Sequence, residues 1–186
     1  MKTARYKLIG ATPLSQGRPH TTPKLERESF DAYDKRTWRE RLNVTELGYV
    51  FIPQMAIKDA LTQISRYLGE KIPGKGNATY TKHFEAGVIV LERIVLSIKK
   101  DKVEYEDLFV PADGEHGSGK RVWKRFPIIP SGWEANAEII ILDEIIDEKL
   151  LTRYFDAAGK FIGVGRFRPQ RGGFYGRFGV DLISFE

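Results

Sequence analysis

The order of apolar patterns along this chain constrains its fold more than any other feature. Runs rich in β-branched residues predict strands, and apolar residues at helical spacing predict helices. With the longer polar stretches set aside, the order is strand, helix, strand, and then the same again. This is the split βαβ order. It predicts an α+β, ferredoxin-like (RRM-like) fold, with an antiparallel sheet, two helices on one face, and long loop or hairpin insertions. The other face of the sheet would be left for a partner.

The two predicted helices have clear start and stop signals. The first follows Pro53 and ends at Gly69, and the second starts after Asp147 as N-cap and ends at Gly159. A further helical piece is expected around Phe30 to Leu42. Strands are expected at Tyr6–Ala11, Gly48–Ile52, Gly87–Ile98, Arg121–Ile129, Ala135–Leu142 and Arg177–Phe185, with Val103–Val110 pairing beside Gly87–Ile98.

The length of 186 residues suits a single domain spanning 1–186 with one sizeable core. Three stretches fall outside the predicted sheet and helices. Residues 15–47 form a charged excursion, 100–134 a hairpin insertion, and 160–179 a glycine-rich loop. A connection as long as 15–47 is usually either functional or poorly ordered.

Composition excludes several classes of protein and site. The chain has no cysteine, which removes disulfides, thiolate metal sites and cysteine nucleophiles. No apolar run approaches the roughly 20 residues that cross a bilayer, so we expect a cytoplasmic protein with no membrane partner. The three histidines lack metal-ligand spacing, and no phosphate-binding P-loop occurs. We therefore predict neither a metal nor a cofactor.

The formal net charge is only +5, but the charges are sorted along the chain. Ala157–Val180 contains five basic residues and Gly117–Phe126 contains four, in both cases without an acid. Lys71–Lys82 adds three lysines, again without an acid, while Glu134–Asp156 collects acidic residues. Clustered basic residues are the electrostatic footprint of a nucleic-acid-binding protein.

The segment Gly163–Gly179 is the strongest of these patches. Glycines let a backbone approach a ligand, arginines neutralise phosphates, and exposed aromatic rings stack on bases. The alternative is a glycine-rich hairpin that packs its aromatic residues into the core, where we place Phe178. The candidate nucleic-acid-binding residues here are Lys160, Arg166, Phe167, Arg168, Arg171, Gly172, Gly173, Phe174, Tyr175 and Arg177.

Two further basic patches are weaker candidates. In the first, basic residues flank an indole in a predicted hairpin. Such a hairpin would either clamp a nucleic-acid strand or be a solvated hairpin whose tryptophan is buried. Its residues are Lys120, Arg121, Trp123, Lys124 and Arg125. The second contains Lys71, Lys75 and Lys82 in a flexible loop, which is equally compatible with an ordinary solvated surface.

No side chain is a strong catalytic candidate. His20, soon after the first strand, is a weak candidate as the acid/base of a metal-independent ribonuclease. Asp31, Asp34 and Asp113 would assist cleavage only if they lie close to it, and a solvated role suits them better. His83 and His116 are expected to be surface loop residues.

Three stretches resemble the RAMP superfamily (repeat-associated mysterious proteins). Gly10-Ala11-Thr12-Pro13-Leu14 is similar to the opening of that family. The segment from Phe51 to Leu61, Phe-Ile-Pro-Gln-Met-Ala-Ile-Lys-Asp-Ala-Leu, resembles the family's entry to its first helix, although Gln54 and Asp59 replace glycines and the terminal arginine is absent. Gly163–Val180 resembles its C-terminal glycine-rich loop and final strand.

The resemblance implies a backbone-like subunit of a CRISPR effector complex. Such proteins bind single-stranded RNA through its phosphates, sequence-tolerantly, and assemble into filaments or with other effector subunits. By this likeness Tyr105–Pro130 would be a thumb-like hairpin and Lys58 a further contact, with single-stranded RNA or DNA as the partner. Two alternatives stay open: a guide-RNA-processing endonuclease of the same fold, or a phage protein that mimics a CRISPR subunit and inhibits interference.

Overall fold

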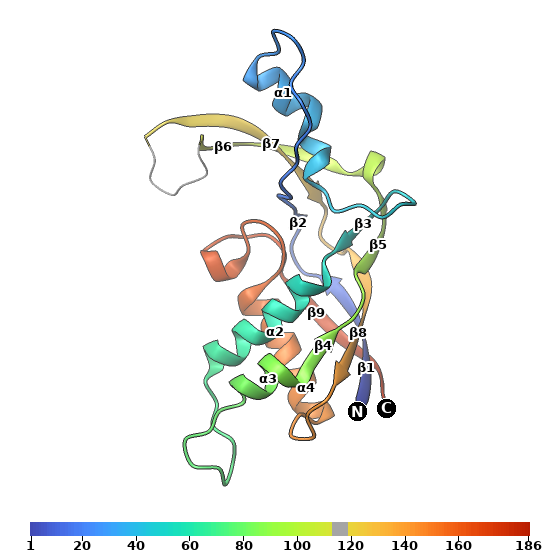
Figure 1. Ribbon diagram of the computed structural model, residues 1–186, viewed down its shortest axis with the longest axis vertical. Helices are drawn as coiled ribbons and strands as arrows, with labels where there is room; N and C mark the ends of the chain where they lie inside the picture. Colours follow the sequence, from blue (N-terminus) through green and yellow to red (C-terminus); the bar gives the residue numbers. More distant parts are fainter. Residues whose placement is uncertain (113–118) are drawn as a thin grey trace.

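The computed structural model describes residues 1–112 and 119–186 (Figure 1). Its main sheet has the strand order β3-β5-β8-β1-β9, all antiparallel, and β4 also pairs with β8. β8 therefore lies between β1 and the strands that follow the first predicted helix, which is the split βαβ arrangement. The expected α+β, ferredoxin-like fold is confirmed. The strands are β1 (Lys2–Gly10), β3 (Tyr49–Ile52), β4 (Val88–Val90), β5 (Ile94–Lys99), β8 (Glu134–Ile141) and β9 (Phe178–Phe185).

Helices cover one face of this sheet (Figure 1). The apolar stripes of α2 (Gln54–Leu68) and α4 (Glu148–Ala157) are buried in the core. α2 packs against β4, and α4 packs against β9 and β1, as in the edge-to-face contact of Tyr6 with Phe155 at 5.2 Å. A short helix, α3 (Thr81–Gly87), follows the loop after α2 and was not predicted, because only Phe84 and Gly87 of its seven residues are buried. Such a short segment gives little periodic signal.

The N-cap of α4 provides a first prediction. An Oδ of Asp147 accepts a hydrogen bond of 2.8 Å from the backbone N–H of Leu150. Replacing Asp147 with alanine should lower the free energy of unfolding by about 1 kcal/mol, because an N–H at the helix end loses its acceptor. Urea denaturation measures this. Glu148→Gln, one residue inside the same helix, is the control and should change stability by less than half as much.

A strand and a helix end differ from the sequence prediction. The strand expected over Gly87–Ile98 is two strands, because Leu91–Arg93 leaves the sheet between β4 and β5. Gly159 does not end the second helix, which continues as a wide helical turn over Ala158–Ile162. Gly159 is instead pressed against β9, where a Cβ would overlap the carbonyl oxygen of Phe178.

A second, three-stranded sheet rises from the first with the order β2-β7-β6 (Figure 1). β6 (Glu104–Pro111) pairs with β7 (Arg121–Ile129), so the expectation that 103–110 pairs with 87–98 is wrong. The long hairpin β6–β7 occupies the predicted insertion, and β2 (Leu14–Ser15) joins its β7 side. The excursion folds onto the hairpin through α1 (Phe30–Thr37) and a 3₁₀ turn, Trp38–Arg41. Two further 3₁₀ turns are Lys100–Lys102 and Pro169–Arg171.

Among the residues that the structure describes, no helix is both long and apolar enough to cross a membrane.

Candidate nucleic-acid interface

The glycine-rich loop after α4 is anchored on β2 and on the segment that links β1 to it. The N–H of Arg166 donates to the carbonyl of Ser15 at 2.7 Å, and that of Gly176 donates to the carbonyl of Pro13 at 2.8 Å. Across the loop, the N–H of Val164 donates to the carbonyl of Gly176 at 3.0 Å. These bonds satisfy backbone groups that a buried loop would otherwise leave unpaired.

The glycines of the loop serve its own folding. Cβ atoms at Gly173 and Gly176 would overlap the carbonyl oxygens of Phe167 and Val164, and Gly176 has a φ of +76°. Gly172 alone of these three has open space around the missing Cβ. The sequence-based expectation was that these glycines admit a ligand, but two of the three positions are occupied by the loop's own backbone.

The loop also contacts the β6–β7 hairpin. The ring of Phe167 lies edge-on to that of Phe126 on β7, with centroids 6.4 Å apart, and Tyr175 Oη donates to an Oε of Glu106 on β6 at 2.5 Å. Burial, followed by this hydrogen bond, raises the pKa of Tyr175 to about 12, so the phenol stays protonated at neutral pH. The two strongest basic patches of the sequence thus form one surface.

Arg166 lies at the junction of loop and hairpin. Its guanidinium carbon stacks 3.2 Å from the ring centroid of Phe126 and 3.8 Å from that of Phe167. Its Nη1 is buried and has no hydrogen-bond partner within the described part of the chain. Burial first, and then the nearby charge of Arg41, lowers the pKa of Arg166 to about 10, which still leaves it charged at neutral pH.

Arg41 reaches the same place from the end of the excursion. Its guanidinium carbon is 4.8 Å from the centroid of Phe126. The group donates to the buried carboxylate of Asp34 and to the carbonyl of Arg125. The other oxygen of Asp34 accepts from the N–H of Arg125 at 2.6 Å. Asp34 therefore holds Arg41 against β7 and is not a solvated loop residue.

A pocket of about 220 Å³ opens between these groups. Its walls combine basic and apolar side chains, and no carboxylate lines it among the residues that the structure describes. Lys124 also lines it, and its ammonium donates to the carbonyl of Ala112 at 2.8 Å. The pocket is lined by Arg41, Val110, Pro111, Lys124, Phe126, Arg166 and Phe167.

The outer part of the hairpin carries an aromatic pair. Trp123 is 61% exposed, and its ring lies 5.3 Å from that of Phe109, over which Arg121 also lies. The alternative of a buried tryptophan is wrong for this residue. Arg125 is committed elsewhere, since it forms a two-pronged ion pair with Asp107 and stacks on Tyr105. Lys120 is exposed near the tip of the hairpin.

The other predicted residues of the loop divide into paired and exposed groups. Arg168 pairs with Asp59 of α2 at 3.2 Å, and Lys160 pairs with Asp156 at 2.6 Å. Arg177 donates to the loop carbonyls of Lys160 and Phe174. Arg171 and Phe174 are exposed. Phe178 is buried in the core, as predicted.

Three predicted contacts lie apart from this surface. Lys58 is directed toward α3, where its ammonium donates to the carbonyls of Phe84 and Glu85, and burial lowers its pKa. Lys71 and Lys75 lie in the loop after α2, at the far end of the molecule from the β6–β7 hairpin (Figure 1). The basic patches therefore do not form one continuous track.

The weak catalytic candidate is held by a ring contact, and no proton-transfer partner is recorded at its Nδ1 within the described part of the chain. His20 stacks on Tyr33 of α1 with centroids 6.0 Å apart, and its Nδ1 makes no hydrogen bond within the described residues. Asp31 pairs with Lys35 on the surface. Asp113 and His116 lie outside the described residues. His83 is not an isolated loop residue, because it lies in α3 and its Nδ1 is 2.5 Å from an Oδ of Asp143.

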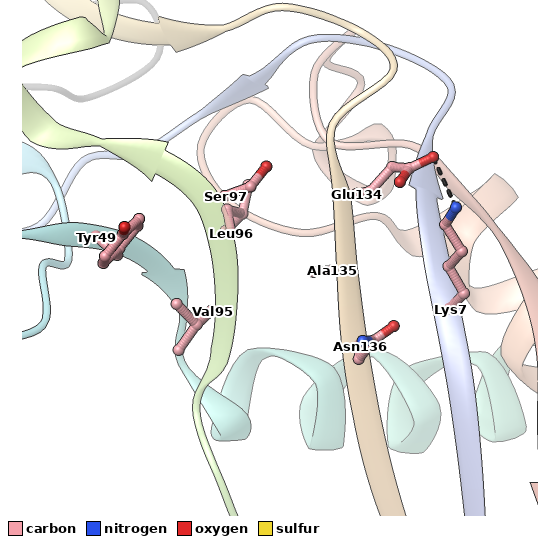
Figure 2. A pocket seen from close by; sticks show the side chains of 8 residues that line it. All are labelled: Lys7, Tyr49, Val95, Leu96, Ser97, Glu134, Ala135 and Asn136. Atoms are coloured by element: carbon pink, nitrogen blue, oxygen red, sulfur yellow. Dashed lines mark ion pairs between the residues drawn. The ribbon is translucent and has the colours of Figure 1, made fainter.

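The sheet face opposite the helices is a different kind of surface (Figure 2). It contains a hollow of about 560 Å³ between β5 and β8, but its charges are paired across the strands. Lys7 bonds Glu134 at 2.8 Å, and Arg5 bonds Glu138 at 2.8 Å. Among the described residues that line the hollow, Tyr49 is the one aromatic residue. RRM proteins stack bases on aromatic residues of this face. Here β3 supplies two partly exposed rings, Tyr49 and Phe51, and each already lies under a cation: Lys99 over Tyr49 and Arg93 over Phe51.

Sequence reasoning missed Arg41, Asp34 as its partner, and Phe126 as the ring on which two arginines lie. Each is separated by more than 80 residues from at least one residue that it contacts, so no local spacing reveals them. One signal was present: Phe126 ends the basic run of the hairpin.

Comparison with solved structures finds the same fold. The crystal structure of Cmr6 from Pyrococcus furiosus matches over 95% of this chain and 96% of that chain, with a TM-score of 0.50 and 16% sequence identity. At this identity the match establishes the fold, which is RAMP-like. No family model matches the chain, and no curated protein is similar to it in sequence.

Proposed function

We propose that this chain binds single-stranded nucleic acid, RNA in the first place, through the surface shared by the glycine-rich loop and the β6–β7 hairpin. One observation carries the proposal: the loop and the hairpin, the two strongest basic and aromatic patches, are in contact. Cations that follow a backbone, together with rings on which bases stack, are what sequence-tolerant single-strand binders present.

The RAMP-like fold and the three RAMP-like stretches of sequence support the same function. On this basis we also propose that the chain acts beside copies of itself or other subunits of a CRISPR effector complex. No observation on His20 favours the endonuclease, so catalysis does not enter the proposal.

A fluorescently labelled 20-nucleotide RNA, titrated with the protein at several salt concentrations, tests the function. We expect binding that differs little between sequences and weakens steeply with salt, because each neutralised phosphate adds about 0.7 to the slope of log affinity against log salt. Single-stranded DNA and duplex RNA of the same length identify the preferred form. Absence of binding to any strand at low salt would overturn the proposal.

Exposed rings provide a variant test. Trp123 on the hairpin and Phe174 on the loop are 61% and 59% exposed, so their removal should spare the fold. The double change Trp123→Ala with Phe174→Ala should weaken RNA binding at least tenfold, since stacking is worth about 1–3 kcal/mol per base.

The matched control is Tyr67→Ala. Tyr67 is 67% exposed and lies about two helical turns beyond Asp59, the residue of α2 that pairs with the loop. It should leave binding unchanged. An equal loss of RNA affinity in the double variant and in Tyr67→Ala would mean that the RNA binds elsewhere on the molecule.

A further inference from the structure

We propose that the pocket between Arg41 and Arg166 receives one phosphate group, and that in the bound state this is a phosphate of the nucleic-acid strand. The inference rests on the proposed function for the identity of the strand. The geometry of the pocket is the independent ground for the phosphate.

The first ground is the unmet hydrogen-bonding capacity of Arg166. Its guanidinium is held between two rings, its Nη1 is buried without a partner, and no carboxylate pairs with it within the described residues. A buried donor that lacks a partner is costly, and the half-buried guanidinium adds to this cost because it lacks a counter-charge among the described residues. An oxyanion in the pocket would supply both an acceptor and a counter-charge.

The second ground is the approach of two like charges. Arg41 and Arg166 lie within 4.8 Å and 3.2 Å of the centroid of the same ring, that of Phe126. Asp34 neutralises only one of them. The charge of Arg41 helps to lower the pKa of Arg166, so the two cations are close enough to repel one another, and an anion in the pocket would relieve this repulsion. Asp34 and the carbonyl of Arg125 nevertheless hold Arg41 beside the ring of Phe126. A buried ion pair therefore keeps the two cations near the same ring.

The third ground is the size and lining of the pocket. Its volume of about 220 Å³ is several times the ~30 Å³ share of one water molecule, so an oxyanion of several heavy atoms fits. Planar guanidinium groups match phosphate oxygens in pairs. Phe167 borders the pocket, and Phe174 and Tyr175 follow it in the same loop. A strand whose phosphate occupies the pocket would therefore have rings beside it for its bases.

Arg166→Gln tests the inference in the intact chain. It should weaken binding of the labelled RNA about tenfold or more and lower the salt slope by about 0.7, since one charge-assisted phosphate contact is lost. Arg166→Lys should restore the slope but only part of the affinity, because an ammonium is a point charge that cannot match the oxygens in pairs. Lys149→Gln removes the same charge from the exposed surface of α4 and should change neither quantity.

A second probe separates this inference from the proposed function. Titration with inorganic phosphate at constant ionic strength, followed by ³¹P line broadening, should show saturable binding that Arg166→Gln abolishes. Phosphate binding without RNA binding supports the pocket and overturns the function. RNA binding that Arg166→Gln and Lys149→Gln affect equally overturns the pocket and leaves the function. Binding of oligoglutamate but not phosphate overturns the pocket in favour of an acidic protein partner.

Discussion

Replacing Asp34 with alanine should lower the free energy of unfolding by about 3–5 kcal/mol, the usual cost of breaking a buried ion pair from one side. The carboxylate is buried, and it accepts from both the guanidinium of Arg41 and the backbone N–H of Arg125. Without it, the charge of Arg41 loses its counter-ion and an N–H of β7 loses its acceptor. The excursion would also lose the hydrogen bond by which Asp34 fixes it to β7.

Denaturation by urea, followed by tryptophan fluorescence, measures this effect, because Trp38 and Trp123 lie on the two elements that Asp34 joins. The control is Asp31→Ala, three residues earlier on α1. Asp31 pairs with Lys35 at 2.8 Å on the exposed side of the helix, so its loss should cost at most about 0.5 kcal/mol. If the two variants were equally stable, Asp34 would not carry the contact between excursion and hairpin.

Much of the fold was predictable because its signals are local. The apolar spacing after Pro53 and the N-cap at Asp147 predict α2 and α4 within a residue or two. The β-branched runs predict β7, β8 and β9 equally well. Where the prediction was wrong, contacts from elsewhere in the chain decide the structure. Gly159 reads as a helix stop, yet its missing side chain makes room for β9.

The candidate interface was predictable in part. The loop and the hairpin each have a composition that indicates a role in binding, but nothing local says that they meet. They meet because the loop is hydrogen-bonded to the backbone of Pro13 and Ser15, and Ser15 also pairs with β7 of the hairpin. Arg41 is the reverse case. Its neighbours in sequence are ordinary charged residues. Its position in the interface depends on its ion pair with the buried Asp34 and on its contact with the ring of Phe126.

The same distinction applies to the basic residues of the chain as a whole. A count of lysines and arginines treats Lys58, Arg125 and Arg166 alike. Lys58 is bonded to carbonyls of α3, and Arg125 to the carboxylate of Asp107. Arg166 alone of the three has a buried nitrogen without a partner in the described structure. Unmet hydrogen-bonding capacity, more than net charge, distinguishes a candidate anion site from a structural ion pair.

Replacing Gly176 with alanine should cost about 2–5 kcal/mol and disorganise the glycine-rich loop. Its φ of +76° is strained for any residue with a Cβ, at about 1–2 kcal/mol. The added methyl group would also overlap the carbonyl oxygen of Val164, and such overpacking typically costs about 1–3 kcal/mol. The overlap would push apart the two loop ends where Val164 and Gly176 are bonded, and with them the bond from Gly176 to Pro13.

Gly172→Ala is the matched control, because Gly172 has a similar φ of +72° but open space around the missing Cβ. It should cost only the strain, about 1–2 kcal/mol. Thermal denaturation gives the difference between the two variants. Below the melting temperature, Gly176→Ala should also weaken RNA binding, since it displaces the part of the loop that holds Arg166 over Phe126. Equal stability of both variants would mean that the loop relaxes around the methyl group, and that its packing on the Pro13 segment does not set its shape.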